Sequence, residues 1–215
     1  MKFISIISGR AVWLFETLAL NPRGFDLQPV YMAIKNRYGF SSPKNREDVE
    51  NASDGIKFLN GTFKVSLRDQ CPMDLIFFND GVVAETKSST VHADAFLEDV
   101  LTFMQKEHGL FFDPAMVVSR RHSSSLLFES AQGFSRFSEI LSGINSLIKE
   151  ETGRSYDVSG LTLNFDSTLP NDGLGSFMIE RRAKVALALN RYYSGAPLRT
   201  DSHIRLLEKF ESLMA

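Results

Sequence analysis

The sequence predicts a mixed α/β (α+β) fold, in which a central mixed sheet is built largely from β-hairpins and at least four amphipathic helices pack on it. Three observations predict this class. Apolar and polar residues alternate with a period of two in the middle of the chain, around Asn-Gly and Asp-Gly dipeptides that suit tight turns. Elsewhere apolar residues recur at spacings of three and four, which is typical of one helix face. The composition, 43% hydrophobic and 23% charged over 215 residues, is ordinary for a globular protein.

The N-terminal part predicts a strand, an ambiguous segment, a helix and a loop. Residues 3–7 form a β-branched run that suits a strand. Residues 11–20 suit a helix or a buried strand equally well, because short apolar runs do not separate these cases. Residues 27–38 carry apolar side chains spaced by four, and Gly39 would end this helix. Residues 41–55 are almost entirely polar and predict an exposed loop.

Two hairpins are predicted next. Residues 56–67 alternate around Asn60-Gly61, and residues 74–87 alternate around Asp80-Gly81. Both dipeptides tolerate the positive φ that two-residue hairpin turns require. The helix at residues 92–108 follows, with a regular apolar stripe on one side, and Gly109 would end it.

The later elements follow in chain order: strands at 116–119 and 125–128 with a polar turn between them, a helix at 132–151, strands at 158–165 and 177–179, a helical face at 185–192, and a last helix that begins at Asp201 or Ser202. The order of hairpins and helix at 56–108 recurs loosely at 115–151, but no residue identity recurs at a fixed period. A repeat protein is therefore not predicted. No linker divides the chain, which favours a single domain over residues 1–215.

Charge, cysteine content and hydropathy limit the class of protein. The net charge of -2 gives no overall positive excess that would attract nucleic acid or anionic lipid. Cys71 is the only cysteine, so no internal disulfide or multi-cysteine metal site can form. Arg10 and Glu16 interrupt the apolar N-terminal segment, which does not resemble a signal peptide, and no 18-residue apolar run occurs. We expect a cytoplasmic protein without a membrane partner.

One group of side chains carries chemical content, and it lies in the second predicted hairpin. With a turn at Asp80-Gly81, antiparallel pairing would place Asp74 opposite Lys87 and Ile76 opposite Glu85. Alternation would then put these side chains on one face of the sheet. Two carboxylates and an ammonium group in this arrangement suit a divalent cation and a water prepared for attack on a phosphodiester.

These residues resemble the core of the PD-(D/E)xK nucleases, in which one strand carries an acid and the next carries Glu-x-Lys. The match covers about 14 of 215 residues, and the order of helix, strands, helix and strand is also similar. The chain departs from the motif where Met73 separates Pro72 from Asp74. The resemblance implies a nuclease in which Asp74 and Glu85 hold Mg²⁺, Lys87 orients the water or the phosphate, and nucleic acid is the partner.

Three other interpretations remain open. The hairpin face is solvated in the first, and a cross-strand pair between Asp74 and Lys87 contributes only about 0.2–1 kcal/mol. In the second, the chain is a non-enzymatic binding or assembly module, such as a homodimer. In the third, an enzyme acts on a small molecule at a site assembled from distant loops. The four histidines have no paired spacing that suggests a zinc site, and no phosphate-binding loop or nucleophile motif occurs.

Overall fold

The computed structural model describes residues 1–41, 55–66, 68–166, 168 and 175–215. In chain order its elements are β1 (Lys2–Leu14), η1 (Thr17–Leu20), α1 (Gln28–Tyr38), β2 (Ile56–Lys64), β3 (Gln70–Phe78), β4 (Gly81–Thr86), α3 (Thr90–His108), η3 (Pro114–Met116), β5 (Ser119–Glu129), α4 (Ser135–Ile140), α5 (Ser142–Thr152), β6 (Gly160–Leu163), β7 (Phe177–Arg181), η4 (Leu187–Leu189), β8 (Arg191–Ala196) and α6 (Thr200–Met214), where η marks a 3-10 helix. The loop predicted at residues 41–55 lies almost entirely outside the described residues.

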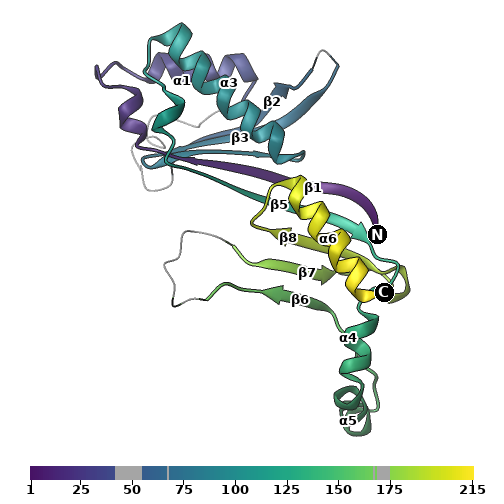
Figure 1. Cartoon of the computed structure of the whole chain (residues 1–215). Coiled ribbons are helices and arrows are strands. Elements are labelled where there is room, and N and C mark those ends of the chain that lie inside the picture. Colours follow the sequence, from purple (N-terminus) through teal and green to yellow (C-terminus); the bar gives the residue numbers. More distant parts are fainter. Residues whose placement is uncertain (42–54, 67, 167, 169–174) are drawn as a thin grey trace. The chain divides into compact units, whose positions relative to one another are not determined.

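The strands are hydrogen-bonded in the order β2-β3-β4-β1-β5-β8-β7-β6 (Figure 1). The pairings β1–β4, β2–β3, β3–β4, β6–β7 and β7–β8 are antiparallel. Together with five α-helices in the described part of the chain, this sheet confirms the predicted α+β class. Among the described helices, none is long and apolar enough to cross a membrane.

The element order of the described chain occurs twice. β1, α1, β2, β3, β4 and α3 are followed by β5, α4 with α5, β6, β7, β8 and α6. The strand order has the same symmetry, because β2-β3-β4-β1 is mirrored by β5-β8-β7-β6. The halves begin at β1 and β5, so the loose recurrence seen from residues 56 and 115 has the wrong boundaries. The sequence hides this repetition because equivalent strands do not share residue identities.

The chain divides into two compact units. The N-terminal unit comprises Ile6–Ser124 with Leu198–Thr200, and the C-terminal unit comprises Met1–Ser5, Ser125–Pro197 and Asp201–Ala215. The prediction of a single domain stays a prediction.

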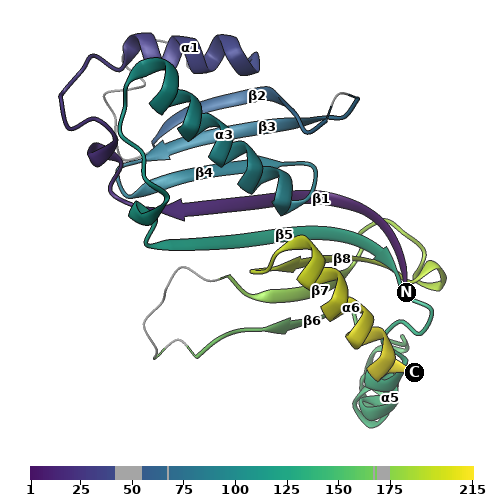
Figure 2. The ribbon, with the colours of Figure 1, turned by 45° about the horizontal axis from the view of Figure 1, so that its top comes forward.

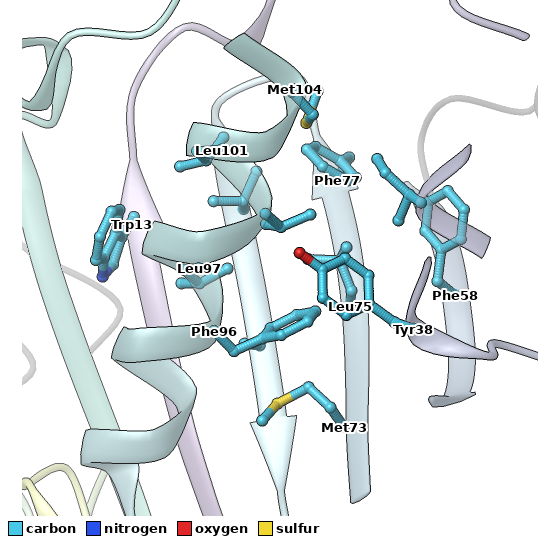
Figure 3. Packing of buried hydrophobic residues seen from close by; sticks show 14 of the residues in the cluster. Trp13, Tyr38, Phe58, Met73, Leu75, Phe77, Phe96, Leu97, Leu101 and Met104 are labelled. Atoms are coloured by element: carbon cyan, nitrogen blue, oxygen red, sulfur yellow. The ribbon is translucent and has the colours of Figure 1, made fainter. Parts of the chain in front are cut away.

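Helices α1 and α3 cover one face of the strands in the N-terminal unit (Figure 2). Figure 3 shows Phe96 and Leu97 of α3 packed over Leu75 of β3, and all three side chains are fully buried. The ring of Tyr38 from α1 meets Phe96 edge-on, with 5.0 Å between the ring centroids. This aromatic contact joins the two helices above the sheet.

Both predicted helices of the N-terminal unit are confirmed, together with their ends. Gly39 and Gly109 adopt the left-handed conformation that ends α1 and α3. At the start of α3, the Ser89 hydroxyl accepts a hydrogen bond from the amide of Val91. Local signals therefore determine these two helices.

The hairpin predicted at residues 56–67 is wrong, because β2 runs straight through Asn60-Gly61. Asn60 has a positive φ of 57°, and the register with β3 shifts between Phe58 and Gly61, so Leu59 and Asn60 form a β-bulge opposite Asp74 and Gly61 is in register with Met73. A Cβ atom on Gly61 would lie 2.3 Å from the ring of Phe40. The glycine is thus required by a close approach to a core aromatic ring.

The two strands predicted around a turn at residues 120–124 are a single strand, β5. Its polar residues have partners on the side of α3. The guanidinium of Arg120 lies 4.0 Å from the ring centroid of Trp13, and His122 Nε2 is 2.8 Å from Asp94 Oδ2 on α3. Because these partners satisfy the polar side chains, residues 120–124 remain part of the strand and do not form a turn.

Two further elements differ from the prediction. The helix expected at 132–151 is divided at Leu141 into α4 and α5. The helical face expected at 185–192 is instead η4 followed by β8. Tyr192 of β8 is buried against Phe128 and Phe134, at ring distances of 5.5 and 5.2 Å. Successive side chains of β8 point to opposite faces of the sheet, so Tyr192 points into the core of the C-terminal unit.

Candidate functional site

The acidic residues expected to form the site occupy neighbouring positions on adjacent strands of the N-terminal unit. Asp74 of β3 is in register with Glu85 of β4, and Glu85 is in register with Arg10 of β1. Residues directly opposite on antiparallel strands have Cβ atoms about 4.5–5.5 Å apart. We call Asp74, Glu85 and Arg10 the carboxylate row.

The carboxylate row lies on the face of the sheet opposite α1 and α3. The chain neighbours Leu75, Ala84 and Ala11 are fully buried in the core beneath these helices. Successive side chains on a strand point to opposite faces, so the row points away from the core. Glu85 is exposed, and Asp74 and Arg10 are half-buried. The row is therefore held by three adjacent strands, with Glu85 as its exposed member.

Asp74 is also bonded to the bulge in β2. Its Oδ1 atom accepts a hydrogen bond of 2.6 Å from the amide of Asn60. This bond fixes the carboxylate and leaves Oδ2 for another partner. This contact is not predictable from the sequence, in which Asn60-Gly61 is typical of a hairpin turn remote from Asp74.

Arg10 is a site residue that the sequence analysis missed. Its Nε atom is buried and has no hydrogen-bond partner in the described structure. Within the described residues, neither Arg10 nor Glu85 takes part in an ion pair, although they are opposite in register. The sequence signal for Arg10 is that it interrupts an apolar run. That signal does not predict that Arg10 lies opposite Glu85 of β4.

The predicted pairings of Asp74 with Lys87 and of Ile76 with Glu85 are wrong. The turn consists of Asn79 and Asp80, because Phe78 is in register with Gly81. A Cβ atom on Gly81 would lie 2.4 Å from the carbonyl oxygen of Trp13, so this glycine serves the contact with β1.

The corrected register moves Glu85 next to Asp74 and leaves Lys87 beyond the end of β4. Lys87 is exposed and has no register partner in β3. Of the three predicted site residues, the structure thus brings Asp74 and Glu85 together and keeps Lys87 two residues away along the chain.

The carboxylate oxygens of the row are the kind of ligand that a hard divalent cation prefers. Mg²⁺ prefers oxygen ligands, keeps several waters, and is often held by one or two carboxylates together with substrate phosphates. Asp74 and Glu85 supply two carboxylates. The described residues contain no group of three or more His, Cys, Asp or Glu side chains that could hold a metal ion.

Two other polar clusters have structural roles. Asp94 accepts hydrogen bonds from Trp13 Nε1 at 2.9 Å and from His122 Nε2 at 2.8 Å, which join α3 to β1 and β5. In the C-terminal unit, the buried Ser194 hydroxyl donates to the carbonyl of Met178 at 2.7 Å and lies 2.8 Å from His203 Nε2. Because the serine proton is committed to a carbonyl, His203 must donate at Nε2 and does not activate Ser194 as a nucleophile.

Cys71 is buried, and burial raises the pKa of its thiol. A raised pKa suppresses the reactive thiolate, which favours a structural role for this residue.

Comparison with known proteins does not place the chain in a family. A scan against protein-family models finds no match, and neither does a search of the curated proteins. A solved structure of Methanococcus jannaschii TBP is similar over 98% of this chain and 97% of that chain, with a TM-score of 0.47 and 13% sequence identity. A likeness at this level carries no argument about function.

Proposed function

We propose that the carboxylate row binds a divalent cation and hydrolyses phosphodiester bonds in nucleic acid. The observation that carries this proposal is the direct register of Asp74 with Glu85 on adjacent strands. Like charges directly opposite each other destabilise a sheet, and a cation shared by the two carboxylates would offset their repulsion. A bound Mg²⁺ would supply that cation.

Each member of the row has a role in this proposal. The carboxylates of Asp74 and Glu85 hold the metal, with Asp74 oriented by its bond to the Asn60 amide. Bound Mg²⁺ supplies Lewis acidity toward a phosphoryl oxygen and an acidified water. The guanidinium of Arg10, which has unused donors beside Glu85, contacts the phosphate and stabilises the charge that develops on it.

Lys87 is an exposed cation two residues beyond Glu85, and its motif implies that it orients the water or the phosphate. The corrected register makes Arg10 the nearer candidate for the phosphate contact, since Arg10 is directly opposite Glu85. Substitution of Arg10 and of Lys87, one at a time, distinguishes the roles of the two side chains.

Cleavage of labelled DNA and RNA, each with Mg²⁺, with Mn²⁺ and with chelator, tests the proposal. Glu85→Gln retains the size of the side chain and removes its charge, so we expect the rate to fall at least about 100-fold. Arg10→Gln should lower the rate by about 100-fold, and Lys87→Gln by less, because Lys87 lies outside the row. Glu98→Gln, at an exposed position on α3, is the matched control and should leave the rate unchanged.

Cleavage that survives Glu85→Gln, or that proceeds equally well with chelator, would contradict the proposal. The absence of metal-dependent cleavage of both DNA and RNA by the unchanged protein would also contradict it.

A second candidate function, assembly with another copy of the chain, is favoured by α4 and α5 of the C-terminal unit. Neither helix contains a buried residue, and Ile140 and Leu147 are 74% and 65% exposed. Short helices are marginal in water unless an apolar face is packed. Sedimentation should then show a concentration-dependent dimer that the double variant Ile140→Ser, Leu147→Ser abolishes, and a monomer at all concentrations would exclude this assembly.

A further inference from the structure

The N-terminal unit contains an apolar cavity that the carboxylate row does not use. Its volume is about 370 Å³, and η1, α1, the ends of β2 and β3, and α3 surround it. Its apolar lining includes Leu20, Leu27, Ile56, Phe77, Met104 and Leu110. Ligand sites in proteins begin at about 300 Å³ and have predominantly apolar walls.

No charged side chain is among the described residues that line the cavity. Transfer of a charged ligand into such a place would cost several kcal/mol without a partner of opposite charge. The described part of the lining therefore favours neutral molecules over charged ones.

Tyr31 of α1 lines the cavity and carries a hydroxyl group that can donate a hydrogen bond. Its ring is held by Phe58 and Phe77, at ring distances of 5.9 and 6.5 Å, and its hydroxyl has no hydrogen-bond partner in the described structure. Burial raises the pKa of this hydroxyl, so it remains protonated. A half-buried hydroxyl without a partner is satisfied by an acceptor on a ligand or by water.

The other interior polar side chains of the lining already have partners. Thr17 Oγ1 donates to the carbonyl of Phe78 at 2.7 Å. The side-chain amide of Asn21 donates to the carbonyl of Phe25 at 2.8 Å and accepts from the amide of Phe25 at 2.9 Å. Asn79 also lines the cavity but is exposed to solvent, so among the half-buried polar side chains of the described lining the hydroxyl of Tyr31 is the one without a partner.

We infer that this cavity binds a neutral, largely apolar small molecule that offers one hydrogen-bond acceptor to the hydroxyl of Tyr31. An apolar cavity of about 150 Å³ holds benzene, so the volume here suits about ten to fifteen non-hydrogen atoms. Aryl ketones of that size have the required shape and a single strong acceptor.

A matched pair of probes tests this inference on the full chain. Butyrophenone carries a carbonyl acceptor, and butylbenzene has a similar shape without one. Their dissociation constants are measured by ligand-observed NMR titration. The unchanged protein should bind butyrophenone more tightly than butylbenzene. Tyr31→Phe keeps the ring, so it should weaken butyrophenone about five-fold, which corresponds to about 1 kcal/mol, and leave butylbenzene unchanged.

A second variant tests the location without disturbing the core. Leu18 lines the cavity and is 72% exposed, so Leu18→Trp adds bulk at the wall and should weaken both probes. Val118→Trp, at an exposed residue outside the lining, is the control and should weaken neither. The inference is overturned if neither probe binds up to its solubility limit, if Tyr31→Phe weakens both probes equally, or if Val118→Trp acts like Leu18→Trp.

Discussion

Replacement of Asp94 by alanine tests the packing of α3 on the sheet that carries the carboxylate row. The carboxylate accepts hydrogen bonds from Trp13 Nε1 and His122 Nε2, and Arg199 lies 3.6 Å away. Hydrogen bonds to a charged group contribute about 1.5–3 kcal/mol each, and their contributions are not fully additive. Alanine recovers up to about 0.7 kcal/mol of helix propensity. We therefore expect Asp94→Ala to lower the free energy of unfolding by about 2–4 kcal/mol at pH 7.

The effect of Asp94→Ala should depend on pH with a definite sign. Burial alone would raise the pKa of Asp94, but hydrogen bonds from His122 and Trp13 and the charge of Arg199 outweigh it and lower the pKa below its ordinary value. A depressed pKa in the folded state stabilises the protein above the unfolded pKa, and this contribution is lost as the pH falls through the folded pKa. The difference between Asp94→Ala and the unchanged protein should thus shrink below about pH 4.

Urea denaturation followed by tryptophan fluorescence measures this prediction directly, because Trp13 is the only tryptophan and donates to Asp94. Glu98→Ala on the same helix is the control, and an exposed substitution of this kind should change the free energy by less than about 0.5 kcal/mol. A loss below about 1 kcal/mol at pH 7, or an effect that does not change from pH 7 to pH 3, would refute the reasoning.

Two further substitutions test the core and the bulge by the same denaturation assay. Phe96→Ala should cost about 3–5 kcal/mol because the side chain is fully buried, whereas Phe111→Ala, at a position 52% exposed, should cost far less, and similar losses would contradict the assigned core. Gly61→Ala should cost about 1–3 kcal/mol because the new methyl group meets the ring of Phe40, while Gly143→Ala, where a Cβ has open space in α5, should be neutral or stabilising by up to about 1 kcal/mol. A neutral Gly61→Ala would show that the bulge is not packed as described.

Helices were the most predictable part of the fold because their signals are local. The apolar spacing in residues 27–38 and 92–108, with Gly39 and Gly109 as stops, was enough to locate α1 and α3. Each signal lies within a few residues of the element that it defines.

Strand register was not predictable, because distant contacts decide it. From the sequence, Gly61 and Gly81 are expected in turns. In the structure they are required because a Cβ atom at these positions would meet the ring of Phe40 and the carbonyl oxygen of Trp13, respectively. The strand register also decides which residues meet in the candidate site. Asp74 and Glu85 could be chosen from their residue types, whereas the position of Arg10 depends on the pairing of β1 with β4.

The central claim is that Asp74 and Glu85 together hold a divalent cation, and titration calorimetry with Mg²⁺ and Mn²⁺ tests it most directly. The unchanged protein and Glu85→Gln are titrated with and without a DNA and an RNA oligonucleotide. The account predicts binding by the unchanged protein that tightens when nucleic acid is present, and loss of that binding in Glu85→Gln. Equal binding by both proteins, or no binding by the unchanged protein under any of these conditions, would contradict the account.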